Sequence, residues 1–160
     1  MTESLKASAR RVQDYLTERG YRLQVRQLPD STRSAKDAAA AIGCEVAQIA
    51  KSLVFKDADS DRPVLVIASG INRVSTDQIR QSLGLQLVQA DGKFVKQRLG
   101  FAIGGVPPVA HTEPTQTLLD VELRQYPVIW AAAGTPNAVF ELTPADLETM
   151  TAGQWLMLAE

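Results

Sequence analysis

The sequence predicts an α+β fold in a single domain spanning residues 1–160. Short apolar or alternating stretches typical of strands are interrupted irregularly by short helical patterns, unlike the regular crossover helices of a βαβ array. The chain has 160 residues, of which 45% are hydrophobic, so it is long enough to bury a core of its own. No linker and no internal repeat divides it, so we expect one domain.

The first half of the chain begins with a predicted helix. Apolar residues at helical spacing place this helix within residues 1–19, and Gly20 ends it. The alternation of residues 21–28 predicts an edge strand. After a loop, Ser34 caps a short Ala-rich helix that stops at Gly43. The remaining elements of this half are helical turns at 45–50, a strand at 51–56, an acidic turn at 57–62 and a strand at 63–70.

The second half continues with two helices, at 75–84 and 91–100, each of which ends in glycine. Residues 101–111 predict a strand that runs into a rigid loop. Thr143 caps a last helix that extends to residue 150, with Pro144 at its first position. Further short strands are expected at 85–90, 116–120, 127–134, 138–142 and 154–158.

The composition excludes several classes of protein. The net charge is −1, although residues 1–56 carry +4 and residues 57–160 carry −5, so the chain could hold a few phosphates but not a long duplex. No apolar run is long enough to cross a bilayer, and the N-terminus lacks the pattern of a signal peptide. We therefore expect a cytoplasmic protein that makes no membrane contact.

Metal, cofactor and nucleophile motifs are equally scarce. Cys44 is the only cysteine and His111 the only histidine, so we expect no internal disulfide and no metal site. Cys44 precedes a helical segment, where its thiol has either a lowered pKa or a buried, inert environment. The sequence contains no GxxxxGK[ST] loop, no GxGxxG fingerprint and no GxSxG elbow, and we expect no cofactor.

Lys51 stands out because it interrupts an apolar run. In a strand from residue 51, its side chain would point to the same face as Leu53 and Phe55. One interpretation is structural: the lysine favours the end of a helix dipole and lays its stem over Leu53. The other is that Lys51 lines a pocket and holds an anion or a polar group of a substrate.

Three loops could also carry chemistry. Residues 103–111 combine two glycines, which allow close approach of the backbone to a ligand, with Pro107 and Pro108, which stiffen the exit. Such a loop can present amides to an oxyanion, or can be a plain turn. Residues 131–147 contain a tight turn at Gly134–Asn137, which is either a hairpin or a polar wall. Residues 68–76 could bind phosphate through Ser69, Gly70, Asn72 or Arg73, or could simply lead into the next helix.

Taken together and in order, these segments resemble the YbaK/ProX family of aminoacyl-tRNA deacylases, which is related to the editing domain of bacterial prolyl-tRNA synthetase. The resemblance is carried by IAKSLVF, VIASG, FAIGGVPPVAH, AAGTPNAVFEL and TPADL, and it covers roughly residues 20–158. It implies a mixed, barrel-like sheet surrounded by helices, no metal, and a key site lysine that matches Lys51. The Gly-x-x-x-Pro element of the family falls on Gly104 to Pro108. Where many relatives have Pro-Phe-Gly-His, this chain has Pro108, Val109, Ala110 and His111.

The resemblance implies hydrolysis of the ester that joins a wrong amino acid to tRNA. We expect amides of Gly104, Gly105 and Val106 to stabilise the oxyanion and Lys51 to anchor a phosphate or ribose oxygen. The base is either His111 or a ribose hydroxyl of the substrate. Candidate substrate-binding residues are Ile103, Pro107, Pro108, His111, Ser69, Gly70, Gly134, Thr135 and Asn137, and candidate pocket walls are Ile103, Val106 and Val109.

The expected partner is the acceptor end of a mischarged tRNA, with an aminoacyl-tRNA synthetase as a further candidate. A small pocket favours Ala, Ser, Thr or Cys as the amino acid, with Ala on proline tRNA as the leading candidate. Cations that could hold the tRNA are Arg73, Lys93, Lys96 and Arg98. The alternative is a module of the same fold that binds tRNA, a nucleotide or a synthetase without hydrolysis.

Overall fold

The fold is built on the antiparallel pair β2 (Ile49–Asp57) and β3 (Pro63–Ser69). The computed structural model describes residues 6–29 and 34–159. Every residue of β3 is buried, and its side chains alternate between two hydrophobic clusters. Leu65 and Ile67 enter the larger cluster and Val64 and Val66 the smaller one. The sheet is therefore covered on both faces where β3 crosses it.

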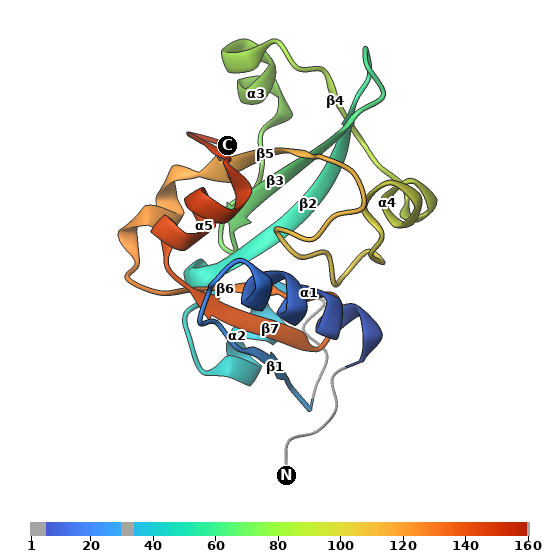
Figure 1. The fold of residues 1–160 in the computed structure, drawn as a ribbon. Coiled ribbons are helices and arrows are strands. Elements are labelled where there is room, and N and C mark those ends of the chain that lie inside the picture. The colour runs from blue at the N-terminus through green and yellow to red at the C-terminus, as the bar shows by residue number, and fades with distance from the viewer. Residues whose placement is uncertain (1–5, 30–33, 160) are drawn as a thin grey trace.

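Within the described residues, eight strands form one mixed sheet, in the order β1-β7-β6-β2-β3-β5-β8 with β4 paired to β2 (Figure 1). β2 pairs with β6, β3 with β5 and β5 with β8 in parallel, while the other pairs are antiparallel. The other strands are β1 (Val25–Gln27), β4 (Leu87–Gln89), β5 (Gln116–Asp120), β6 (Ile129–Ala132), β7 (Ala138–Leu142) and β8 (Gln154–Leu156). The predicted α+β class and mixed sheet are confirmed, and the sheet is open rather than closed into a barrel.

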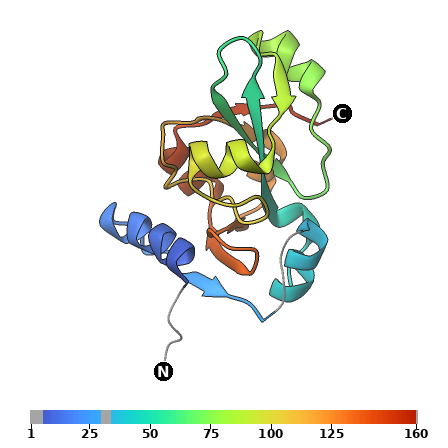
Figure 2. The ribbon, with the colours of Figure 1, turned by 90° about the vertical axis from the view of Figure 1, so that its right-hand side faces the viewer.

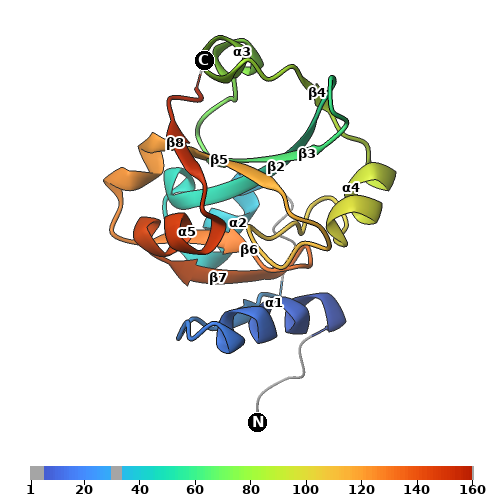
Figure 3. The same cartoon turned by 45° about the horizontal axis from the view of Figure 1, so that its top comes forward.

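Helices pack at several places around this sheet. They are α1 (Ala7–Glu18), α2 (Ala35–Ile42), α3 (Thr76–Leu83), α4 (Gly92–Leu99) and α5 (Pro144–Thr151), with short 3₁₀ turns η1 (Val46–Gln48) and η2 (Val121–Gln125). Figures 1 and 3 place α1 beside β7 and α3 at the opposite end of the molecule. Figure 2 shows α1 and α2 on opposite sides of the lower end, with β1 between them.

The predicted helix boundaries follow the capping chemistry of the sequence. Ser34, Ser75 and Thr143 each accept a hydrogen bond from the backbone N–H three residues later, at 3.0, 3.2 and 3.1 Å. Helices α2, α3 and α4 end at glycines in the left-handed region, as predicted. Side-chain caps and glycine stops are local signals, so these boundaries could be predicted without knowing the tertiary structure.

Several elements differ from their predictions. Strand β1 covers only Val25–Gln27 of the segment 21–28, and the helical turns expected at 45–50 end early, because Ile49 and Ala50 already belong to β2. Residues 101–111 form a loop and no strand, since Phe101 is buried in the larger cluster and no strand edge pairs with this segment. The predicted residues 1–5 of the first helix and the loop residues 30–33 lie outside the described residues.

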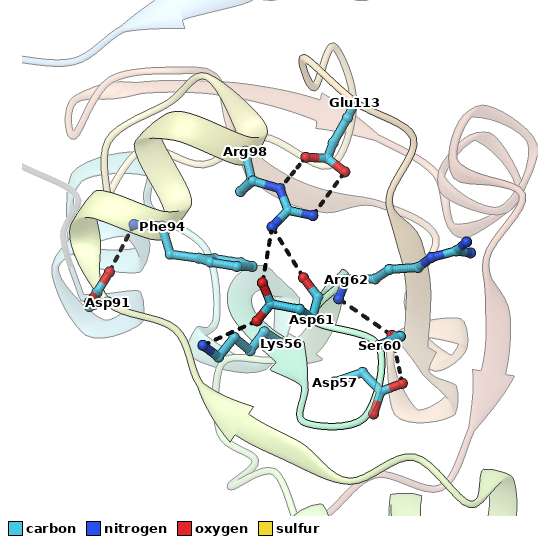
Figure 4. A network of polar contacts seen from close by, with 9 residues as sticks. All are labelled: Lys56, Asp57, Ser60, Asp61, Arg62, Asp91, Phe94, Arg98 and Glu113. Carbon is cyan, nitrogen blue, oxygen red and sulfur yellow. Dashed lines mark hydrogen bonds and ion pairs between the residues drawn. The ribbon is translucent and has the colours of Figure 1, made fainter.

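A network of ion pairs joins the β2–β3 turn to α4 and to the segment after the 101–111 loop (Figure 4). The Arg98 guanidinium donates to the Glu113 carboxylate through Nε and Nη2 and to the Asp61 backbone carbonyl, the latter at 3.1 Å. The Lys56 ammonium lies 3.3 Å from the Asp61 carboxylate, and both cations lie over the Phe94 ring. This network fixes α4 on the side of the sheet where β4 pairs with β2.

Helix α1 is anchored in the larger cluster by three fully buried residues, Ala9, Val12 and Leu16. Replacing Leu16 by alanine should lower the free energy of unfolding by about 2–5 kcal/mol, because it removes buried methyl groups and leaves a cavity. Urea denaturation measures this loss. The control Ile71→Ala removes a side chain that is 61% exposed and should change stability by only about 0.5 kcal/mol. Equal stability of the two variants would contradict the packing of α1.

Candidate active site

Strand β2 changes neighbours along one edge, and the change leaves a gap. The parallel strand β6 pairs with Ile49 and Ala50, whereas β4 pairs with residues from Phe55 to Asp57. Within the part of the chain that the structure describes, Lys51, Ser52 and Leu53 have no strand partner on this edge. A ligand can therefore approach the strand here, where a ladder would otherwise exclude it.

A cavity of about 420 Å³ lies at this gap. Lys51, Ser52 and Leu53 line it from β2, and Gly104 and Val106 line it from the 101–111 loop. The other walls come from α2, η1, β6, β7 and the residue after β3, and they include Lys36, Gly70, Trp130 and Val139. Lys51 and the loop of residues 101–111, called the glycine loop below, were predicted separately from the sequence and line one cavity.

A smaller cavity of about 130 Å³ adjoins the first. The two share Ser52 and Leu53 of β2 and Gly104 and Val106 of the loop. The smaller cavity is otherwise mostly apolar, with Ile103 at its outer side and Val95 of α4 at its inner side. A small apolar group attached to a ligand in the larger cavity could occupy it.

The Lys51 ammonium is half-buried and has no carboxylate within ion-pairing distance among the described residues. Burial lowers the pKa of this ammonium, and the negative charge of Asp120 opposes that shift. A desolvated cation without a close partner has capacity left for an anionic or carbonyl oxygen. This environment supports the interpretation that Lys51 binds a substrate group in a pocket over the structural one, in which its stem only covers Leu53.

Asp120 was missed by the sequence analysis, although it ends the predicted strand 116–120. The residue is 1% exposed, and its carboxylate accepts three hydrogen bonds, from Ser69 N at 3.0 Å, Asn72 Nδ2 at 2.8 Å and Glu122 N at 3.0 Å. Ser69 itself is buried and donates from Oγ to the Ala47 carbonyl at 2.7 Å. Ser69 therefore supports Asp120 and η1 and does not line the cavity.

The backbone amides of the glycine loop differ in whether they are already hydrogen-bonded. Gly104 has a φ of +97° and lines the cavity, whereas the Gly105 N–H donates to the Ala102 carbonyl at 3.2 Å. A Cβ on Gly105 would lie 2.7 Å from the Thr135 backbone, so this glycine is required by packing. In the described chain, the Gly104 and Val106 N–H groups have no backbone acceptor. Of the three amides expected to bind an oxyanion, that of Gly105 is thus already hydrogen-bonded within the loop.

The turn at 134–137 supports the loop from behind. Gly134 N donates to the Gly105 carbonyl at 2.8 Å, and Thr135 Oγ1 donates to Asn137 Oδ1 at 3.1 Å. Asn137 Nδ2 in turn donates to the Leu28 carbonyl at 3.1 Å. Gly134, Thr135 and Asn137 do not line either cavity, so the hairpin interpretation fits them better than a polar wall.

His111 and the prolines lie on the other side of the loop. Pro107, Pro108 and Val109 are buried, and Pro108, Val109 and His111 line a separate cleft beside Tyr15 of α1. His111 Nε2 lies 2.7 Å from the Pro107 carbonyl oxygen. Burial lowers the pKa of His111, the Pro107 carbonyl opposes this shift, and the charge of Arg11 adds to it. The structure does not bring His111 or Val109 into the Lys51 cavity.

The candidate tRNA cations are dispersed. Lys93 and Lys96 are exposed on α4, while Arg98 is engaged by Glu113 and Asp61 (Figure 4). Arg73 is exposed beyond β3. Lys36, at the start of α2, is the cation that joins Lys51 in the cavity wall, and no local sequence signal marked it.

Other chemistries find little support in the described residues. Residues 6–29 and 34–159 contain no cluster of three His, Cys, Asp or Glu side chains that could hold a metal ion. Burial raises the pKa of the Cys44 thiol, which fits the inert alternative. None of the described helices combines the length and the apolar character that a membrane crossing requires.

The described geometry matches known proteins over nearly the whole chain. A solved structure of a candidate trans-editing enzyme for prolyl tRNA synthetase is 47% identical, with a TM-score of 0.92 over 98% of this chain and 99% of that one. A structure from work on epitope backbone grafting onto scaffold proteins is 43% identical, with a TM-score of 0.91 over 98% and 99%. The uncharacterized protein YwhH of Bacillus subtilis (strain 168) is 29% identical over 140 residues, 88% of each chain.

The family model of the aminoacyl-tRNA editing domain matches residues 29–150. This segment contains the β2–β3 pair, the glycine loop and the whole of the cavity lined by Lys51. The chain therefore belongs to the aminoacyl-tRNA editing domain family.

Proposed function

We propose that this protein is a trans-editing deacylase, which hydrolyses the ester of a mischarged tRNA that carries a small amino acid. The observation that carries the proposal is that Lys51 of β2 and Gly104 and Val106 of the glycine loop line one cavity. Membership of the editing family and similarity to a candidate trans-editing enzyme for prolyl tRNA synthetase support it. Alanine on proline tRNA is the leading substrate.

The chemistry requires positioning and charge stabilisation more than a strong nucleophile, because an aminoacyl ester is already activated. The Gly104 and Val106 N–H groups donate to the ester carbonyl oxygen and stabilise its negative charge as water attacks. The Lys51 ammonium binds a phosphate or ribose oxygen of the terminal adenosine. Its positive potential also favours the oxyanion.

The proton of the attacking water passes through the neighbouring ribose hydroxyl of the substrate to the departing ribose oxygen. The ester C–O bond breaks in the same stage, so that free amino acid and intact tRNA are released. No His, Cys, Asp or Glu side chain among the described residues lines the Lys51 cavity, which favours a base supplied by the substrate. His111 faces the separate cleft and is not assigned this role.

Selection by size follows from the smaller cavity, which receives the amino-acid side chain between Ile103 and Val106. A rigid pocket excludes a larger group by steric clash but separates groups that differ by one methylene by only about 1–3 kcal/mol. We therefore expect Ser, Thr or Cys esters to compete with Ala esters. Cognate prolyl esters should be hydrolysed slowly.

A second function, binding without hydrolysis, is favoured by the same absence of a protein base from the described cavity wall. Such a module would hold the acceptor end of tRNA through Lys51 and Lys36 and release no amino acid. Measurement of binding and of amino-acid release on the same mischarged tRNA separates the two functions.

Replacing Lys51 by alanine should lower the rate of deacylation of Ala-tRNA for proline by about 10²-fold or more, because the cation in the cavity is lost. Release of labelled amino acid in single turnover measures this effect across a panel of Ala, Ser, Thr, Cys and Pro esters. Lys56→Ala is the matched control. It removes a lysine of the same strand whose ammonium pairs with Asp61 outside the cavity, and it should leave the rate unchanged. Equal rates for the two variants would remove Lys51 from the mechanism.

The pH dependence should reflect the lowered pKa of Lys51. Since burial disfavours the charged form, the ammonium is lost at a lower pH than that of a free lysine, whose pKa is about 10.4. After subtraction of uncatalysed hydrolysis, the ratio of the wild-type rate to the Lys51→Ala rate should be constant near neutral pH and fall as the pH rises. Lys51→Arg keeps its charge, so any activity it retains should not show this fall. A ratio that instead rises through the alkaline range would mean that neutral Lys51 is the active form.

The salt dependence should be shallow because few cations border the cavity. Two or three contacts with single-stranded phosphates predict that log affinity falls with log salt with a slope of about −1.4 to −2.1. Lys36→Ala should reduce the magnitude of this slope by about 0.7, whereas Lys93→Ala, a change on exposed α4, should leave it unchanged. Fluorescence anisotropy with a labelled acceptor-stem RNA over a range of salt concentrations measures both. A steep slope that depends on Lys93 would place the RNA over α4 instead.

A further inference from the structure

We propose that helix α1, through Arg11, is a positioning element for the loop that carries Gly104 and Val106. The inference extends the proposed function, because it concerns how the two amides are held in place. Helix α1 (Ala7–Glu18) precedes residues 29–150, which match the editing-family model. The support of the loop thus comes from a part of the chain outside the matched segment.

The Arg11 guanidinium bridges the two ends of the loop. It donates to the Gly100 carbonyl at 3.4 Å at one end, and to the Ala110 carbonyl at 2.6 Å and Thr112 Oγ1 at 3.3 Å at the other. A further hydrogen bond, from Thr112 N to the Leu99 carbonyl at 2.9 Å, closes the base of the loop. A planar group with five donors can satisfy acceptors on both ends at once, which an ammonium cannot do in the same geometry.

The contact of Arg11 with the loop is close. The centre of the guanidinium lies 4.5 Å from the centroid of the buried Phe101 ring, a cation–π arrangement. A Cβ on Gly100 would lie 2.7 Å from Arg11 Nη1 and 2.3 Å from Thr112 Oγ1, so a side chain at this position would displace the guanidinium from its present contacts. The guanidinium of α1 is therefore in direct contact with the start of the loop.

The backbone conformation of Ala110 is a second, independent reason why the loop needs support from Arg11. Its φ is +69°, a left-handed conformation that is strained for a residue with a Cβ. The carbonyl of this residue accepts the shortest hydrogen bond made by Arg11. The arginine thus holds the loop exit in a conformation that the chain would leave if the bond were lost.

Helix α1 also supports the turn behind the loop. A Cβ on Gly134 would lie 2.6 Å from the Ser8 carbonyl oxygen, so the first turn of α1 packs directly on this glycine. Gly134 N in turn donates to the Gly105 carbonyl. Two separate contacts, at Arg11 and at Ser8, therefore connect α1 to the backbone on either side of Gly104. Amides that stabilise an oxyanion must be held in place before the reaction, and this helix supplies the constraint.

The test compares Arg11→Ala and Arg11→Lys with Arg10→Ala, which removes the neighbouring exposed arginine of the same helix. Amide hydrogen exchange of residues 101–110 and steady-state deacylation kinetics are measured on the 160-residue proteins. Arg11→Ala should speed exchange in this loop selectively and lower kcat by about 10–100-fold with little change in KM, since the loop amides act in the transition state. Arg11→Lys should fall between wild type and Arg11→Ala, millimolar guanidinium should partly restore Arg11→Ala, and Arg10→Ala should match wild type.

Several results would overturn the proposal: unchanged loop exchange in Arg11→Ala, faster exchange with unchanged kcat, or faster exchange throughout the protein in both Arg11 variants. If the wild-type protein hydrolyses no mischarged tRNA, the proposed function fails separately. The exchange data then decide whether Arg11 holds the loop, since they do not depend on activity.

Discussion

The interrupted edge of β2 is the feature on which the rest of the site depends. A strand that kept one neighbour throughout would bury the backbone of Lys51 to Leu53 in a ladder. Because β6 leaves after Ala50 and β4 joins only at Phe55, the strand instead faces a cavity. The β2–β3 pair can carry this gap because β3 is buried throughout and holds β2 from Ala50 to Lys56 on the other edge. Pairing with β3 along one edge of β2 thus allows the other edge to stay unpaired at Lys51 to Leu53.

Charge in the cavity is arranged so that Lys51 remains available. Asp120 lies near enough to influence its pKa, but this carboxylate is committed to Ser69, Asn72 and the Glu122 amide. A direct ion pair would compete with a substrate phosphate or carbonyl, whereas a nearby fixed charge offsets part of the desolvation and leaves the ammonium free to bind. The same cavity is lined by Gly104 and Val106, whose N–H groups have no backbone acceptor in the described chain, so a cation and two unpaired backbone amides belong to one cavity wall.

Local chemistry explains what the sequence could predict. Capping side chains and glycine stops predicted the helices, alternation and apolar runs predicted most strands, and the odd position of Lys51 in such a run marked one wall of the cavity. Non-local pairing explains what was missed. Trp130 lines the cavity because it pairs with Ile49, and Lys36 lines it because α2 packs on β2. His111 lies outside the cavity because its ring contacts the Pro107 carbonyl and Arg11 binds the neighbouring Ala110 carbonyl on the far side of the loop. The Gly105 amide was assigned to the substrate because its bond to Ala102 could not be foreseen.

A crystal structure with a non-hydrolysable analogue, an alanyl amide of 3′-amino-adenosine with its 5′ phosphate, would show whether the carbonyl of the substrate binds between Lys51 and the glycine loop. We expect the carbonyl oxygen to lie about 3 Å from the Gly104 and Val106 nitrogens, the alanyl methyl group to point toward Ile103, and the Lys51 ammonium to contact a phosphate or ribose oxygen. Density for the analogue in the cleft beside His111, with the Lys51 cavity empty, would contradict this expectation.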